Sequence, residues 1–138
     1  MGEIWILFLI ATVWTGDICA FLVGSWIGRH RLYPKISPKK TVEGLIAAAL
    51  GSGLVSLIFR EFFIPHLDRV FSLLAALMLG LLGQLGDLTE SMLKRSAQVK
   101  DSGNLLPGHG GMLDRLDSFL FSAPFLYYVL IYWLKETP

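Results

Sequence analysis

Long apolar stretches separated by three polar loops dominate the sequence. The first stretch runs from Ile4 to about Gly28 and contains a single acid, Asp17. The others run from about Gly44 to Phe63, from Val70 to Leu85, and from about Leu113 to Leu134. A helix needs roughly 20 mostly apolar residues to cross a bilayer. The pattern therefore predicts an all-α, polytopic transmembrane protein with about four spans.

The charges in the loops predict how these spans are oriented. Residues 29–43 contain five Lys or Arg residues and one acid, and residues 94–112 begin with further basic residues. The loop of residues 64–69 is charge-balanced. If every span crosses, the two basic loops share one side, which the positive-inside rule makes cytoplasmic. We therefore expect a multi-pass membrane protein whose two basic loops face the cytoplasm.

Composition and charge agree with a membrane protein. Hydrophobic residues make up 54% of the 138 residues. Charged residues make up 17%, below the roughly 25% of soluble domains. A formal net charge of +1 argues against an electrostatic nucleic-acid binder. The single cysteine, Cys19, excludes an intrachain disulfide framework.

Acids inside or beside the spans are the first candidates for function, because a carboxylate within a span costs about 2.5–3.5 kcal/mol. Four polar residues share one face of the third helix through their i, i+3, i+4 and i+7 spacing: Asp87, Glu90, Ser91 and Lys94. Asp114 and Asp117 share a face of the fourth helix in the same way. Both clusters are predicted at cytoplasmic helix ends, flanking one loop. Such a group of oxygens suits Mg²⁺ that also takes phosphate oxygens.

The loop between the acids is rich in glycine and proline, which impose a backbone path and expose N–H groups as phosphate-binding loops do. Its charged and titratable residues include Lys94, Arg95, Lys100, Asp101 and His109. Lys and Arg supply cations for phosphate groups, whereas a structural role competes with phosphate binding at His109. Ser37, Lys39 and Lys40 precede the second helix and form a weaker candidate anion site. The chain has no Walker A motif, which argues against a P-loop NTPase.

Residues 91–117 resemble the signature of the phosphatidate cytidylyltransferase family. They read Ser91-Met-Leu-Lys94-Arg95, four residues, Lys100-Asp101-Ser102-Gly103, then Leu106-Pro107-Gly108-His109-Gly110-Gly111-Met-Leu-Asp114-Arg115-Leu-Asp117. Two further elements agree with the family, namely Ser37-Pro38-Lys39-Lys40-Thr41 with Glu43-Gly44, and Asp17 with Ala20, Gly24 and Gly28. The resemblance covers nearly the whole chain.

The resemblance implies a nucleotidyltransferase of phospholipid biosynthesis that moves a cytidylyl group from CTP to phosphatidate, giving CDP-diacylglycerol and pyrophosphate. It implies Mg²⁺ held by Asp87 and Asp114, with a K⁺ companion. It also implies a multi-pass protein of the inner (plasma) membrane whose active site lies on the cytoplasmic face. The catalytic residues by resemblance are Asp87, Asp114, Lys100 and Asp117. The expected substrate-binding residues are Ser37, Lys39, Lys40, Glu90, Ser91, Lys94, Arg95, Asp101, His109 and Arg115. The expected partners are CTP, phosphatidate, membrane lipid and a second copy in a homodimer, with no nucleic acid.

Family members are roughly twice as long as this chain, so we expect residues 1–138 to form the C-terminal catalytic half. One alternative is a half that is inactive without an N-terminal partner. Another is a different CTP-dependent lipid enzyme, such as a CDP-archaeol synthase or a polyprenol kinase. A third is an ion or proton carrier built on Asp17, Asp87 and Asp117.

Overall fold

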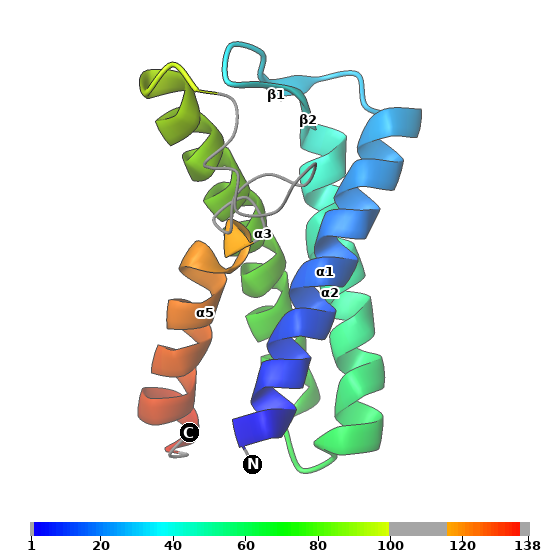
Figure 1. The fold of residues 1–138 in the computed structure, drawn as a ribbon. Helices are drawn as coiled ribbons and strands as arrows, with labels where there is room; N and C mark the ends of the chain where they lie inside the picture. The colour runs from blue at the N-terminus through cyan, green and yellow to red at the C-terminus, as the bar shows by residue number, and fades with distance from the viewer. Residues whose placement is uncertain (1, 100–115, 136–138) are drawn as a thin grey trace.

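Three long helices form the body of the protein (Figure 1). The structure is a computed structural model that describes residues 2–99 and 116–135. The three long helices are α1 (Gly2–Trp26), α2 (Val42–Phe63) and α3 (Arg69–Ser96), each long and apolar enough to cross a membrane. The shorter α5 (Phe119–Tyr128) continues directly into the π-helix η1 (Val129–Leu134). The predicted all-α, polytopic architecture is confirmed, with the first three spans where the sequence placed them. The described part of the fourth is shorter, and its predicted start lies outside the described residues.

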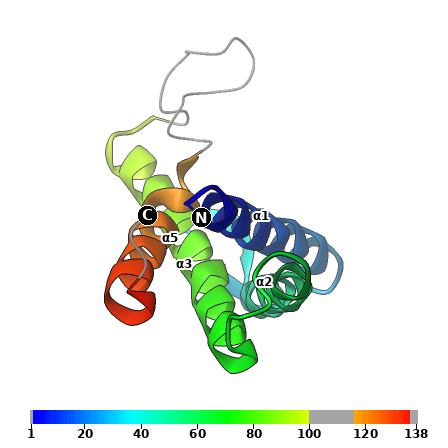
Figure 2. The same ribbon diagram turned by 90° about the horizontal axis from the view of Figure 1, so that it is seen from below.

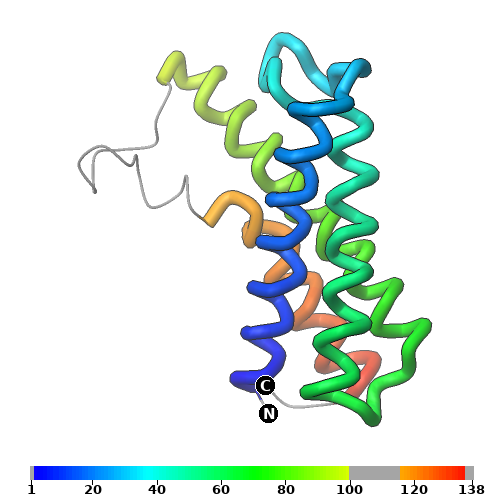
Figure 3. Tube along the Cα trace, turned by 90° about the vertical axis from the view of Figure 1, so that its right-hand side faces the viewer, coloured from blue at the N-terminus to red at the C-terminus, as the bar shows by residue number. Residues whose placement is uncertain are grey.

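The helices pack side by side in chain order. α1 contacts α2, α2 contacts α3, and α3 contacts α5, while α1 also touches α3. Figure 2 shows α3 between α2 and α5. The C-terminal part of α3 leans away from α1 and α2, as the side view shows (Figure 3). The segment joining α1 to α2 and the C-terminal end of α3 lie at one end of the bundle, and the N-terminus and η1 at the other (Figure 1). The basic segment before α2 and the described basic residues Lys94 and Arg95 at the end of α3 therefore lie at the same end of the bundle, as the topology prediction required.

Small residues bring the long helices close together. A Cβ added at Gly16 of α1 or at Gly80 of α3 would lie 2.6 Å from the Ser52 hydroxyl of α2. That hydroxyl donates a 2.7 Å hydrogen bond to the carbonyl oxygen of Thr12. A Cβ at Gly44 would lie 2.8 Å from a carbonyl oxygen of α1. Close approach at small residues, with hydroxyls bonded between helices, is typical of helices packed in lipid.

The outer surface of the bundle is apolar while small polar residues lie inside. Phe21, Trp26 and Phe62 are 72%, 82% and 78% exposed. Within residues 2–99 and 116–135, the fully buried hydroxyl side chains are Thr12, Ser52, Ser56, Ser72 and Ser122. This distribution suits lipid around the bundle rather than water.

A β-hairpin lies where the sequence predicted only a loop. Strand β1 (Arg31–Tyr33) pairs antiparallel with β2 (Ser37–Thr41). Thr41 ends β2 and caps α2 at once, since its hydroxyl accepts a 3.1 Å hydrogen bond from the N–H of Gly44. The hairpin and the cap together fix the direction in which the two lysines of β2 leave the backbone.

Side-chain hydrogen bonds also close the loop between α2 and α3. Asp68 caps α3 by accepting a 2.9 Å hydrogen bond from the N–H of Phe71. Arg60 donates to the carbonyl oxygens of Leu67 and Pro65, at 2.6 Å and 2.7 Å. These bonds stabilise the end of the bundle that lies opposite the hairpin.

Candidate functional site

The polar face of α3 provides the first residues of the candidate site. Asp87, Glu90 and Lys94 lie on one face of the helix, as their spacing predicted, and Lys94 pairs with Glu90 at 3.3 Å. Glu90 is only 2% exposed. The apolar run ends at Leu85, but the helix continues to Ser96. Asp87 and Glu90 therefore lie within α3 and not at its end, because the helix extends beyond its apolar stretch.

Asp117 joins this face from the segment that precedes α5. Oxygen atoms of Asp87, Glu90 and Asp117 all lie within 4.8 Å of one another. Asp117 was predicted on the fourth helix, but it lies two residues before α5 begins. Gly86 permits the approach, because a Cβ there would overlap the carbonyl oxygen of Asp117. We call these three residues the carboxylate cluster.

Crowding makes the carboxylate cluster electrostatically unfavourable without a cation. Burial raises the pKa of Asp117, the adjacent carboxyl groups of Asp87 and Glu90 act in the same direction, and together they bring it to about 8. The backbone N–H of Ser118 offsets part of this by donating a 2.6 Å hydrogen bond to the Asp117 carboxylate. A cation among the three groups would favour their ionised forms. The cluster therefore has the donor atoms and the spacing of a metal-ion site.

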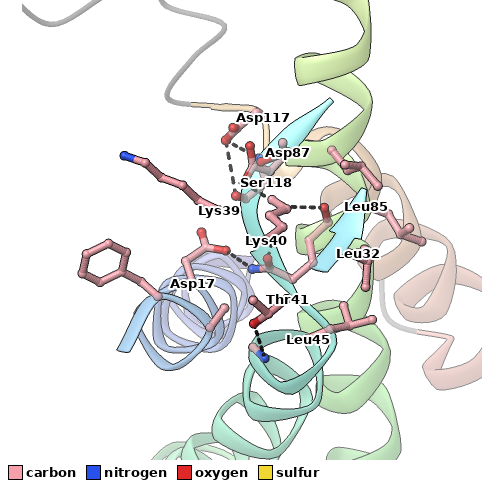
Figure 4. A pocket seen from close by; sticks show the side chains of 16 residues that line it. Asp17, Leu32, Lys39, Lys40, Thr41, Leu45, Leu85, Asp87, Asp117 and Ser118 are labelled. Carbon is pink, nitrogen blue, oxygen red and sulfur yellow. Dashed lines mark hydrogen bonds and ion pairs between the residues drawn. The ribbon is translucent and has the colours of Figure 1, made fainter. Parts of the chain in front are cut away.

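A lysine from the hairpin reaches the edge of this cluster. Lys40 Nζ lies 2.7 Å from Asp87 Oδ2 and donates to both oxygens of Gln84, the carbonyl at 3.0 Å and Oε1 at 3.2 Å. Gln84 Nε2 in turn donates a 2.7 Å hydrogen bond to Asp17 Oδ1. Figure 4 shows this connection running from α1 through Lys40 to Asp87. Polar side chains from α1, β2 and α3 thus form one network.

Two neighbouring cavities lie beside the network. The first, of about 370 Å³, is lined by Asp17, Lys40, Gln84, Asp87 and Asp117, together with apolar residues. The second, of about 330 Å³, is lined mainly by polar and basic residues: Ser37, Lys39, Ser91, Lys94 and Arg95. Ser37 and Lys39 line both cavities. An acidic and a basic cavity therefore meet at strand β2.

Most of the predicted site residues that the structure describes come together here. Four of them meet at the carboxylate cluster, namely Asp87, Glu90, Asp117 and Lys40. The other five line the second cavity, namely Ser37, Lys39, Ser91, Lys94 and Arg95. Five predicted residues lie outside the described part of the chain: Lys100, Asp101, His109, Asp114 and Arg115. The metal role predicted for Asp114 therefore stays a prediction. Sequence reasoning missed Gln84, although a carboxamide within the apolar run of the third span was a signal that could have found it.

The fold and the site define a polytopic membrane protein with a carboxylate cluster beside a basic, phosphate-compatible cavity. The chain belongs to the cytidylyltransferase family, whose sequence model matches residues 1–133.

Individual relatives are similar over most of this chain. It is 46% identical to the phosphatidate cytidylyltransferase of Bacillus subtilis over 129 residues, which are 94% of this chain and 48% of that one. It is 48% identical over 130 residues to a phosphatidate cytidylyltransferase of Staphylococcus epidermidis, covering 94% and 50%. Uncharacterized protein YnbB of Escherichia coli is 44% identical over 131 residues, covering 95% and 44%. The chain spans about half the length of the curated relatives it matches.

Proposed function

We propose that this chain is the catalytic half of an enzyme that transfers a cytidylyl group from CTP to phosphatidate. The observation that carries the proposal is the carboxylate cluster beside Lys40 in a chain of the cytidylyltransferase family. The relatives named phosphatidate cytidylyltransferase support this choice of substrates. The products are CDP-diacylglycerol and pyrophosphate, and the reaction belongs to phospholipid biosynthesis.

The reaction needs charge neutralisation and positioning more than covalent catalysis. A phosphate oxygen of phosphatidate attacks the α-phosphorus of CTP, and the bond from that phosphorus to the oxygen bridging to the β-phosphate breaks as pyrophosphate leaves. Transfer of this kind is accelerated when fixed positive charge faces the phosphate oxygens. Lys40 provides such charge at the cluster, and Lys39, Lys94 and Arg95 provide it along the second cavity. The two cavities together would place both phosphate groups near Asp87.

The carboxylate cluster fits Mg²⁺, because its ligands are hard oxygens from three acids within 4.8 Å. Asp87, Glu90 and Asp117 would hold the ion, with Asp114 as a further ligand and K⁺ as a companion by resemblance. When bound, Mg²⁺ supplies Lewis-acid stabilisation of phosphate charge. Asp87 would then take part both in holding the ion and in the contact with Lys40, whose Nζ lies 2.7 Å from Asp87 Oδ2. Lys100, Asp101, His109 and Arg115 are proposed to contact substrate phosphates from the adjoining loop.

The proposed setting is the inner (plasma) membrane, with the site at the cytoplasmic face and phosphatidate entering from the lipid. The curated relatives are about twice as long, so we propose that activity requires an N-terminal half as partner. We also propose a homodimer, as the family resemblance implies. An inactive half without its partner, and a CTP-dependent enzyme with another lipid acceptor, are alternatives that the following experiment separates.

The test uses membranes that contain this chain alone or with the N-terminal half of the Bacillus subtilis relative. Radiolabelled CTP, Mg²⁺ and phosphatidate are supplied, and lipid-soluble label is measured; archaeal and polyprenol lipids replace phosphatidate in parallel reactions. Asp87→Asn keeps the side-chain shape but removes its charge, and should lower turnover about 100-fold. Thr89→Val is the matched control, since among the described residues the Thr89 hydroxyl donates to the Leu85 carbonyl oxygen of its own helix. Undiminished turnover in Asp87→Asn would refute the proposed role of the cluster.

A further inference from the structure

Lys40 has a complete set of hydrogen-bond acceptors. A lysine ammonium has three N–H donors and no acceptor. Lys40 Nζ faces three oxygens, at 2.7 Å from Asp87 Oδ2, 3.0 Å from the Gln84 carbonyl and 3.2 Å from Gln84 Oε1. The side chain is only 15% exposed. Two of its three partners therefore belong to Gln84, and one belongs to the carboxylate cluster.

The chemistry of its neighbours fixes the carboxamide of Gln84 in one orientation. An ionised carboxylate only accepts hydrogen bonds, so Asp17 must face the NH₂ group, which donates to it at 2.7 Å. An ammonium only donates, so Lys40 must face Oε1. Gln84 is 9% exposed, which leaves it few other partners. Asp17, on α1, thus determines which end of the carboxamide Lys40 meets.

We propose that Asp17 and Gln84 are positioning residues that hold the Lys40 ammonium in place while it exchanges Asp87 for a phosphate oxygen of CTP. This inference rests on the proposed function. Asp87, which Lys40 contacts, belongs to the carboxylate cluster, where the cation is proposed to bind. A cation bound at the cluster would compete with Lys40 for Asp87, which would leave Lys40 one N–H to donate elsewhere while its two bonds to Gln84 remain. Because Lys40 lines the first cavity, that N–H would be available to a phosphate oxygen bound there.

The position of Gln84 matters because lysine has a long, flexible side chain. Without the carboxamide, the Lys40 ammonium would keep only its hydrogen bond to the Gln84 backbone carbonyl once it left Asp87. Its flexible four-carbon side chain would then no longer hold it in one position. The cost should therefore appear in the binding of Mg²⁺–CTP and in the KM for CTP. The KM for phosphatidate should stay unchanged. A residue that only fills space would not raise the KM for CTP while leaving the KM for phosphatidate unchanged.

The first test variant is Gln84→Met, which keeps the length and the neutral charge but removes the carboxamide. Loss of a hydrogen bond to a charged group predicts that the Kd for Mg²⁺–CTP rises about tenfold. Binding of labelled CTP is measured by equilibrium dialysis on the detergent-solubilised chain with its N-terminal partner. Thr89→Val again serves as the control, and elution from a sizing column verifies folding. Unchanged affinity in Gln84→Met would overturn the inference.

The second test reverses the hydrogen bond between the two residues. In Gln84→Glu alone, two carboxylates face each other, and Mg²⁺–CTP binding should weaken about tenfold or more. In the double variant Asp17→Asn with Gln84→Glu, the new asparagine donates to the new glutamate, which keeps an oxygen for Lys40. Binding should return to within about threefold of the wild type. A double variant as weak as Gln84→Glu alone would overturn the inference.

The binding measurements separate this inference from the proposed function. If the wild type binds Mg²⁺–CTP without turnover, the proposed reaction is wrong, and the Gln84 variants still decide the positioning role. If the wild type turns over and Gln84→Met binds equally well, only the positioning role is wrong. If the wild type does not bind Mg²⁺–CTP, both are wrong.

Discussion

Gly86 is the residue whose substitution most sharply tests how the carboxylate cluster is assembled. A Cβ at this position would overlap the carbonyl oxygen of Asp117 and lie 3.3 Å from its carbonyl carbon. These are backbone atoms and cannot rotate away as a side chain would. Restoring an ordinary contact requires the Asp117 backbone to move by about 1 Å. We therefore predict that Gly86→Ala displaces Asp117 from Asp87 and Glu90.

Gly83 provides a matched control one turn earlier in α3. A Cβ there would meet a methyl group of Val13 at 3.4 Å and the carbonyl oxygen of Ser118 at 3.5 Å, which are ordinary contacts. Both substitutions gain about 1 kcal/mol of helix propensity. Only Gly86→Ala also pays an overpacking cost of about 1–3 kcal/mol. The two variants should thus differ in stability by that cost, with Gly86→Ala the less stable.

The assay for this prediction combines Mn²⁺ binding with thermal unfolding in detergent. Displacing one ligand should weaken Mn²⁺ binding by about tenfold or more in Gly86→Ala, measured by electron paramagnetic resonance of free Mn²⁺. Gly83→Ala should bind Mn²⁺ as the wild type does and melt at the same temperature or higher. Equal Mn²⁺ affinity and equal melting temperature in both variants would refute the idea that close packing at Gly86 builds the cluster.

Three other substitutions test separate parts of the structure. Asp68→Ala removes the N-terminal cap of α3 and should cost about 1 kcal/mol in thermal stability, with Asp68→Asn as the control that retains a cap; an unchanged melting temperature would contradict the cap. Arg60→Met removes the hydrogen bond to the Leu67 carbonyl and should destabilise by about 1–3 kcal/mol without altering Mn²⁺ binding. Lys40→Met removes the cation that competes at Asp87, so Mn²⁺ alone should bind more tightly while Mn²⁺–CTP binds more weakly. Changes of the same sign in both measurements would count against the contact between Lys40 and Asp87.

The sequence was sufficient to predict the spans because hydropathy and length alone determine which segments can cross a bilayer. The same-face spacing of Asp87, Glu90 and Lys94 was also predictable, since helical periodicity places such residues together without any tertiary information. Each of these features depends on local sequence only.

Features that depend on contacts between distant segments were not predictable in the same way. The hairpin was missed because its strands are short and polar, although Pro34 and Lys35 between them are turn residues. Gln84 was missed because its partners, Asp17 and Lys40, are 67 and 44 residues away along the chain. The position of Asp117 relative to α5 was wrong because the apolar pattern does not mark where a helix begins.

The length of α3 has a consequence for how the proposed lipid substrate would meet the site. Asp87 is eighteen residues beyond the first residue of α3, so it lies about 27 Å along the helix axis at 1.5 Å per residue. The hydrocarbon layer of a bilayer is about 30 Å thick. If α3 enters that layer near its first residue, Asp87 lies at the depth where hydrocarbon gives way to headgroups. A membrane lipid would then reach Asp87 with its phosphate at its own natural depth and its acyl chains still in the bilayer.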